Sequence, residues 1–175
     1  MRIHVESEIG HPRALVYPTY RDRMPEVAAH IPDIEAIIER SREERPGGPK
    51  IHNEWVSRTE LPRFVRAFVS ADRLRWDDYA DWSDEDFAGT FVVTFGIFTE
   101  QIRWQGRNQF LASSVGSTTV RVEGEIDIDV RSIPGVPGWV AGPLKPRLER
   151  YVARVVSDNI HQMNTSVERH LADLG

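Results

Sequence analysis

Apolar and polar residues alternate over much of the chain, which is the pattern of β-strands that bury one face and expose the other. The clearest run, residues 117–130, sets Val120, Val122, Ile126, Ile128 and Val130 against charged neighbours. The alternating runs are residues 1–10, 50–59, 73–82, 89–98, 101–112 and 117–130. We expect them to pair as an antiparallel sheet with one dry face and one wet face.

Three further segments before the last part of the chain have features of helices. Residues 12–31 contain three prolines, which break a helical pattern into short pieces. Residues 32–45 begin with Pro32, a favoured first-turn residue, and end before a Pro-Gly-Gly-Pro turn, so we expect a second helix there. Residues 61–71 place two phenylalanines four positions apart behind a proline, which predicts a short helix.

The last part of the chain has the pattern of a long helix with a polar interruption. Apolar residues recur there every three or four positions, at Val152, Val156, Ile160, Met163, Val167 and Leu171. The helix would hold about 30 residues and span about 45 Å. Asn159 falls near the middle of the apolar stripe. An amide against bare hydrocarbon costs about 1 to 3 kcal/mol unless it is hydrogen-bonded, so Asn159 needs a polar partner.

Composition limits the class of protein. The chain has 175 residues, of which 40% are hydrophobic, and we expect one domain over residues 1–175. A net charge of -5 argues against a nucleic-acid partner, and the lack of cysteine excludes disulfides and thiolate chemistry. The first residues do not resemble a signal peptide, and no apolar run approaches the roughly 20 residues of a membrane span. We therefore expect a cytoplasmic protein with no integral membrane segment.

The order of the expected elements is strand, two helices, a run of antiparallel strands and one long helix, an α+β arrangement. This order resembles the helix-grip fold of the START-like superfamily, also called SRPBCC, which includes lipid-transfer START domains and polyketide cyclases. The most local similarity is residues 133–152, IPGVPGWVAGPLKPRLERYV, a Gly/Pro bridge leading into the terminal helix. The resemblance implies a curved antiparallel sheet wrapped around the C-terminal helix, often with unfilled space between them.

Such a space would be a binding cavity for a small molecule. From the sheet we expect its walls to include Trp55, Trp76, Asp78, Phe95, Trp104, Asn108 and Phe110, and from the helix Val152, Val156, Asn159 and Met163. A mostly apolar wall with a few polar groups is typical of ligand sites. The alternatives are that the aromatic side chains form an ordinary core, that Asn159 bonds a loop carbonyl, and that Asp78 faces water at a strand edge or bulge.

The bridge at residues 133–143 carries the apolar residues Val136, Trp139 and Val140 without any periodicity. One interpretation is a loop that folds over the sheet edge and packs its own tryptophan. The other is a lid over the mouth of the cavity, with Pro and Gly as hinges. Trp139 would then touch a membrane or a donor protein during loading.

Catalytic motifs are missing from the sequence. It has no phosphate-binding glycine loop, no GxSxG elbow and no HExxH pair, and we expect no metal and no cofactor. The leading hypothesis is binding or carriage of a small hydrophobic ligand, lipid or polyketide-like. The first alternative is a cyclase or aromatase-type enzyme, with Tyr79, His170 and Asp78 as the acid-base candidates. The second alternative is a protein-interaction module.

Overall fold

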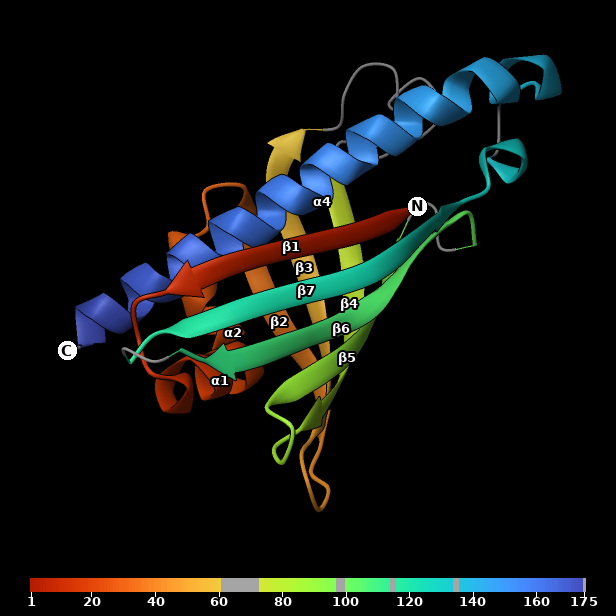
Figure 1. Cartoon of the computed structure of the whole chain (residues 1–175). Coiled ribbons are helices and arrows are strands. Elements are labelled where there is room, and N and C mark those ends of the chain that lie inside the picture. Colours follow the sequence, from red (N-terminus) through yellow and green to blue (C-terminus); the bar gives the residue numbers. More distant parts are fainter. Residues whose placement is uncertain (61–72, 97–99, 114–115, 134–135, 175) are drawn as a thin grey trace.

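The computed structural model describes residues 1–60, 73–96, 100–113, 116–133 and 136–174 (Figure 1). The strands are β1 (Arg2–Ile9), β2 (Ile34–Glu43), β3 (Lys50–Glu60), β4 (Arg73–Ser83), β5 (Ala88–Phe95), β6 (Ile102–Ala112) and β7 (Thr118–Ile128). The helices are α1 (Arg13–Asp22), α2 (Met24–Val27) and α4 (Gly138–Leu174), with short 3₁₀ turns at η1 (Ala28–His30) and η2 (Val130–Ser132). None of these helices is long and apolar enough to cross a membrane.

The seven strands form one antiparallel sheet in the order β1-β7-β6-β5-β4-β3-β2. The sheet bends around α4, which runs along its concave side, while α1 and α2 lie at one end (Figure 1). Gly106 and Gly124 face each other on β6 and β7. A Cβ atom on Gly106 would lie 2.2 Å from the carbonyl oxygen of Glu123, so the close approach at this point in the sheet requires glycine.

Each alternating run predicted as a strand contains a strand of the structure, but the helix predicted for residues 32–45 is wrong. That segment contains β2, the edge strand beside β3. Its pairing with β3 shifts register between Ile34 and Ala36 and again between Glu39 and Ser41. These bulges interrupt the two-residue alternation, so that buried Ile34 and Ile37 lie three apart, as they would in a helix. Its many charged residues suit an exposed edge.

The terminal helix is confirmed, but it is longer than predicted and it starts earlier. α4 has 37 residues and includes Trp139 and Val140 in its first turn. The expected irregular bridge therefore ends before Gly138, where α4 begins. Pro143 and Pro146 lie inside the helix, and their presence made this part of the sequence read as a loop. The helix predicted for residues 61–71 lies outside the described residues.

The solid core lies where α1 and α2 pack between the sheet and the C-terminal half of α4. Phe110 of β6 is 1% exposed there, and its ring contacts Tyr17 and Tyr20 edge-on at centroid distances of 5.4 and 5.0 Å. Tyr20 donates a hydrogen bond to Asn164 of α4. Ser166 of α4 donates to the carbonyl of His30 at 2.9 Å. These contacts hold the segment of α1, α2 and η1 against both the sheet and α4.

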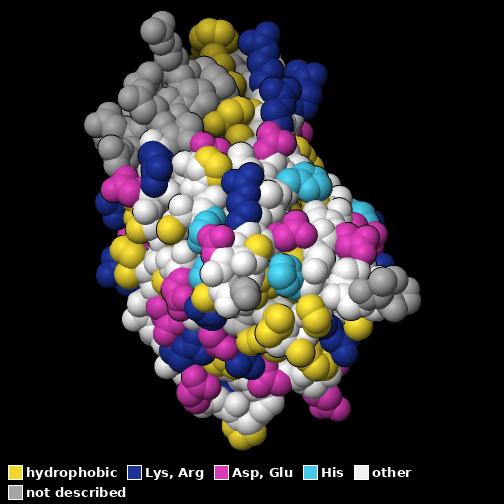
Figure 2. Space-filling view, turned by 90° about the vertical axis from the view of Figure 1, so that its left-hand side faces the viewer, with side chains coloured by type: hydrophobic (Ala, Val, Ile, Leu, Met, Phe, Trp, Pro, Cys, Tyr) yellow, Lys and Arg dark blue, Asp and Glu magenta, His cyan; other side chains and the backbone are white. Residues whose placement is uncertain are grey.

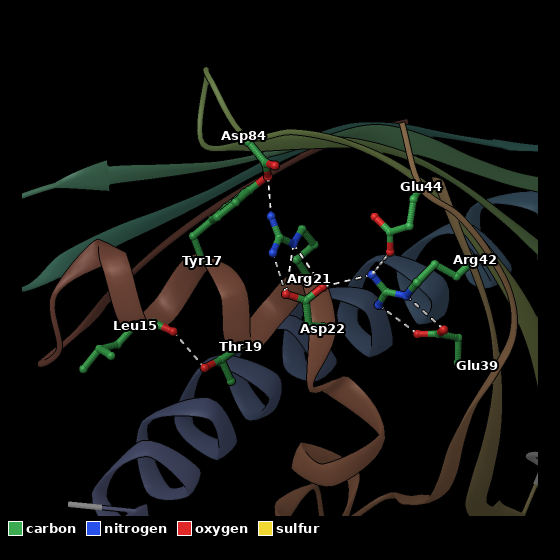
Figure 3. Close-up of polar contacts among 9 residues, drawn as sticks. All are labelled: Leu15, Tyr17, Thr19, Arg21, Asp22, Glu39, Arg42, Glu44 and Asp84. Atoms are coloured by element: carbon green, nitrogen blue, oxygen red, sulfur yellow. Dashed lines mark hydrogen bonds and ion pairs between the residues drawn. The ribbon is translucent and has the colours of Figure 1, made fainter. Parts of the chain in front are cut away.

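A polar network also fixes α1 to the sheet (Figure 3). Arg21 bonds Asp22 and reaches Asp84 in the turn between β4 and β5, and Tyr17 donates to the same Asp84 at 2.8 Å. Arg42 of β2 then bonds Asp22 at 3.0 Å. The helix is thereby linked to two separate parts of the sheet, which closes one end of the space that the sheet surrounds.

Candidate ligand cavity

A cavity of about 170 Å³ lies between the concave face of the sheet and α4. An apolar cavity of about 150 Å³ is large enough to hold benzene, so this space suits a small organic molecule. Beyond the predicted residues, its walls include Tyr20 and Met24 from the small helices, Asn53, Leu74, Trp82, Phe91, Val93, Ile102 and Val122 from the sheet, and Leu148, Tyr151, Val155 and Ile160 from α4.

Ten of the eleven residues predicted for the cavity wall line it in the structure: Trp55, Trp76, Asp78, Phe95, Trp104, Asn108, Val152, Val156, Asn159 and Met163. Phe110 is the exception. It lies on the same face of β6 as Trp104 and Asn108, but α1 covers that end of the sheet and buries its ring. Alternation along a strand predicts the face, whereas the position of α1 decides which residues on that face border open space.

The sheet register brings the wall residues into rows across the strands. Trp55, Trp76 and Phe95 are successive cross-strand partners on β3, β4 and β5. The rings of Trp55 and Trp76 stack at a centroid distance of 5.7 Å. The next row contains Asn53 and Asp78, which pair directly across β3 and β4. An aromatic row therefore borders a polar pair inside the cavity.

Asp78 faces the cavity, and the alternative that it meets water at a strand edge is wrong. Its strand β4 lies inside the sheet between β3 and β5. The residue keeps some accessible surface and borders the cavity, but Oδ1 of its carboxyl group is buried in the protein. This desolvation raises the pKa of Asp78 from 3.8 to about 7. Its protonated and ionised forms are therefore both populated near neutral pH.

Four polar atoms in the cavity wall have no hydrogen-bond partner among the described residues. They are Oδ1 of Asn53, Oδ1 of Asp78, and the indole Nε1 atoms of Trp55 and Trp104. Buried polar groups are normally satisfied, so such a cluster needs an explanation. Sequence reasoning missed Asn53, although alternation in β3 places it between inward-facing Ile51 and Trp55.

Asn159 also lines the cavity. None of the side-chain hydrogen bonds found in the described part of the chain involves it, so the alternative of a bond to a loop carbonyl is not seen there. The amide that interrupts the apolar stripe of α4 instead borders the open space. The contribution of Asn159 is a polar group on the wall opposite the sheet.

The other two acid-base candidates lie elsewhere. Tyr79 is 47% exposed on the outer face of the sheet, where its ring stacks on His52 at 4.3 Å. His170 lies near the C-terminal end of α4 beside His30, with Nε2 at 3.8 Å from Glu26. Neither residue lines the cavity, whereas Asp78 does.

Trp139 is 82% exposed in the first turn of α4. The interpretation of this segment as a loop that packs its own tryptophan is therefore wrong. Val136 and Val140 are partly buried on either side of Trp139. None of the three is among the residues that line the cavity. They precede Leu148, the first residue of α4 that lines the cavity.

No protein-family model matches the chain, and no curated protein matches it in sequence. Solved structures match in fold over nearly the whole chain. A START superfamily protein from Mycobacterium smegmatis has 10% identity and a TM-score of 0.64, with 99% of each chain covered. The ZhuI aromatase/cyclase from Streptomyces sp. R1128 has 14% identity and a TM-score of 0.65, covering 98% of this chain and 95% of the other.

Norcoclaurine synthase from Thalictrum flavum is also similar, with 12% identity and a TM-score of 0.57, over 98% of this chain and 86% of the other. At these identities the similarity concerns the fold. The chain has the α+β helix-grip fold of the START-like, or SRPBCC, superfamily.

Proposed function

We propose that the protein binds a small hydrophobic ligand in the cavity between the sheet and α4. The observation that carries this proposal is the cavity itself, whose wall is mostly aromatic and aliphatic. Structures of similar fold include a START superfamily protein and an aromatase/cyclase, and this similarity supports the proposal. A ligand that buries about 250 Å² of apolar surface gains about 6 kcal/mol before the cost of association.

Native mass spectrometry of the purified protein tests the proposal directly, because a hydrophobic molecule that co-purifies would appear as added mass. Thermal shift with a panel of small aromatic and fatty compounds is the second measurement. A ligand that binds only the folded state raises the melting temperature by mass action. The proposal fails if no molecule co-purifies and no compound in the panel shifts the melting temperature.

A second candidate function, a cyclase-type enzyme, has one specific observation in its favour. Asp78 borders the cavity with a pKa of about 7, which suits a general acid or base at neutral pH. Conversion of a linear polyketide-like substrate by the wild-type protein, lost in Asp78→Asn, would support the enzyme. A ligand that co-purifies unchanged and no turnover would leave binding or carriage as the function.

We also propose that the ligand is loaded at the start of α4, with Val136, Trp139 and Val140 as the apolar rim, or lid, of the cavity mouth. The whole chain has a net charge of -5, but residues 138–154 contain Lys145, Arg147, Arg150 and Arg154 against the single acid Glu149. Figure 2 shows hydrophobic and cationic side chains side by side at the upper end of the molecule, where α4 begins. An exposed tryptophan beside cations is typical of transient contact with an anionic lipid surface.

A further inference from the structure

The charges in the cavity wall are unbalanced. Asp78 is the single carboxylate among the described lining residues, and these include no Lys, Arg or His. The other titratable groups of the described wall are Tyr20 on α1 and Tyr151 on α4, and desolvation raises the pKa of both, so they stay neutral. An ionised Asp78 therefore has no cationic partner in the described part of the wall. A buried carboxylate in that position favours a ligand that brings the positive charge.

Asn53 is placed to share such a ligand with Asp78. The two residues are direct cross-strand partners on the inner face, so their Cβ atoms lie about 5 Å apart. Asn53 is 7% exposed, and its Oδ1 atom has no hydrogen-bond partner among the described residues, as is also true of Asp78 Oδ1. No hydrogen bond found in the structure joins the two side chains. A protonated amine carries several N–H donors and could satisfy both oxygens at once.

Aromatic rings lie in the row beside the polar pair. Trp76 lies two residues from Asp78 on the same face of β4 and stacks on Trp55, and Phe95 is the next cross-strand neighbour. Trp104 lines the same cavity from β6. Aromatic faces attract cations, and the attraction strengthens when the cation is removed from water. The rings and the carboxylate thus favour the same kind of ligand group.

From this arrangement we propose that the ligand is a hydrophobic amine whose protonated nitrogen lies between Asn53 and Asp78, with its apolar part against the tryptophans and α4. The inference rests on the proposed function and adds the charge of the ligand to it. A neutral alcohol of the same shape offers one donor and no charge, so it would leave one of the two oxygens unsatisfied and gain nothing from the carboxylate.

A matched pair of probes tests the inference by isothermal titration calorimetry at pH 8. The probes are 2-(1-naphthyl)ethylamine and 2-(1-naphthyl)ethanol, which differ only in the terminal group. We expect the amine to bind at least tenfold more tightly than the alcohol. In Asp78→Asn the amine should lose about tenfold in affinity while the alcohol changes by less than threefold.

Asp77→Asn is the matched control, because Asp77 precedes Asp78 on β4 and its carboxylate bonds His52 at 2.6 Å, outside the cavity wall. It should leave both affinities unchanged. The wild-type protein provides a test that needs no variant. Amine affinity should rise about tenfold from pH 6 to pH 8 as Asp78 ionises, while the affinity for the alcohol stays flat.

The outcomes separate the inference from the function on which it rests. Equal affinities for amine and alcohol, or a preference for the alcohol, would overturn the amine inference and leave hydrophobic binding in place. The same holds if neither probe binds but a neutral molecule co-purifies. Failure of both probes, with no co-purified molecule and no thermal shift from any compound of the panel, would overturn both the inference and the proposed function.

Discussion

The two halves of the space under α4 are built from the same sheet face and the same helix, yet one is solid and the other is hollow. In the solid half, Val167 of α4 is 0% exposed and Phe110 is 1% exposed. In the hollow half, Val152, Met163 and Phe95 remain partly exposed and line the cavity. The difference is the presence of α1 and α2, which insert Tyr17, Tyr20 and their neighbours between the two walls.

This contrast shows that apolar character alone does not distinguish core from binding site. Both halves are rich in aromatic rings, and both face the concave side of the sheet. A cavity remains where neither α1 nor α2 fills the space between the sheet and α4. Variants in the two halves can test this contrast, and the largest expected change is in stability.

Truncation of a ring should cost far more in the solid half. Phe110→Ala removes a fully packed ring, and we expect it to lower the free energy of unfolding by about 3 to 5 kcal/mol. Phe95→Ala removes a ring that already borders empty space, and about 1 kcal/mol is expected. Urea denaturation of both variants checks this. Equal losses would mean that the two halves are packed alike.

The buried carboxyl group in the hollow half should make stability depend on pH. The pKa of Asp78 is raised from 3.8 to about 7 on folding, so the folded state holds the proton more tightly than the unfolded state does. The resulting stability is present at low pH and is lost as pH rises through about 7. Asp78→Asn removes this loss, so it should stabilise the protein by about 2 to 4 kcal/mol at pH 8 and by little at pH 3.

Urea denaturation of the wild type and Asp78→Asn at several pH values measures that difference. Asp77→Asn serves again as the control, because its side chain lies on the outer face. A stability gain that is the same at every pH would show that Asp78 is not desolvated in the folded protein.

A larger side chain in each half should affect stability and ligand binding differently. Val152→Phe places a larger ring where there is room, so we expect a stability change within about 1 kcal/mol and a loss of the thermal shift caused by ligands. Val167→Phe overpacks the solid half and should cost about 1 to 3 kcal/mol. Thermal melts with and without the naphthyl probes give both readouts. A Val152→Phe variant that still binds them would place the ligand elsewhere.

The smallest change in stability is expected at the exposed start of α4. Trp139→Ser removes a side chain that is 82% exposed, so the free energy of unfolding should change by less than about 0.5 kcal/mol. Its effect should appear in co-sedimentation with vesicles that contain phosphatidylserine, where binding should fall severalfold. Leu174→Ser, at the other end of α4 and 56% exposed, is the matched control. Equal binding by the wild type and both variants would remove the start of α4 as the loading site.

Some elements could be predicted because a local pattern specifies them. Alternation in residues 117–130 gave a strand with the expected inner face, since each inward residue is two positions from the next. The same rule placed Trp76, Asp78 and Trp104 toward α4. The helix predicted for residues 32–45 was wrong because two bulges in β2 break that spacing. The start of α4 was missed because proline and glycine resemble a loop in sequence.

Within the candidate site, Asn53 was missed and Phe110 was placed wrongly, and both errors have a physical reason. The inward face of β3 was evident from its alternation, but nothing local marked Asn53 as lying opposite Asp78. That pairing depends on the register between β3 and β4. Phe110 satisfies every local criterion for a wall residue, and only the packing of α1 against it decides otherwise.

The sequence by itself determined the order of most elements, the inner face of each regular strand and the polar interruption of α4, because these follow from the spacing of side chains along one segment. The tertiary structure decided where the interior is filled, which polar groups meet there, and the raised pKa of Asp78. These depend on distances between segments far apart in the chain. The curvature of the sheet and the placement of α1 and α2 set those distances.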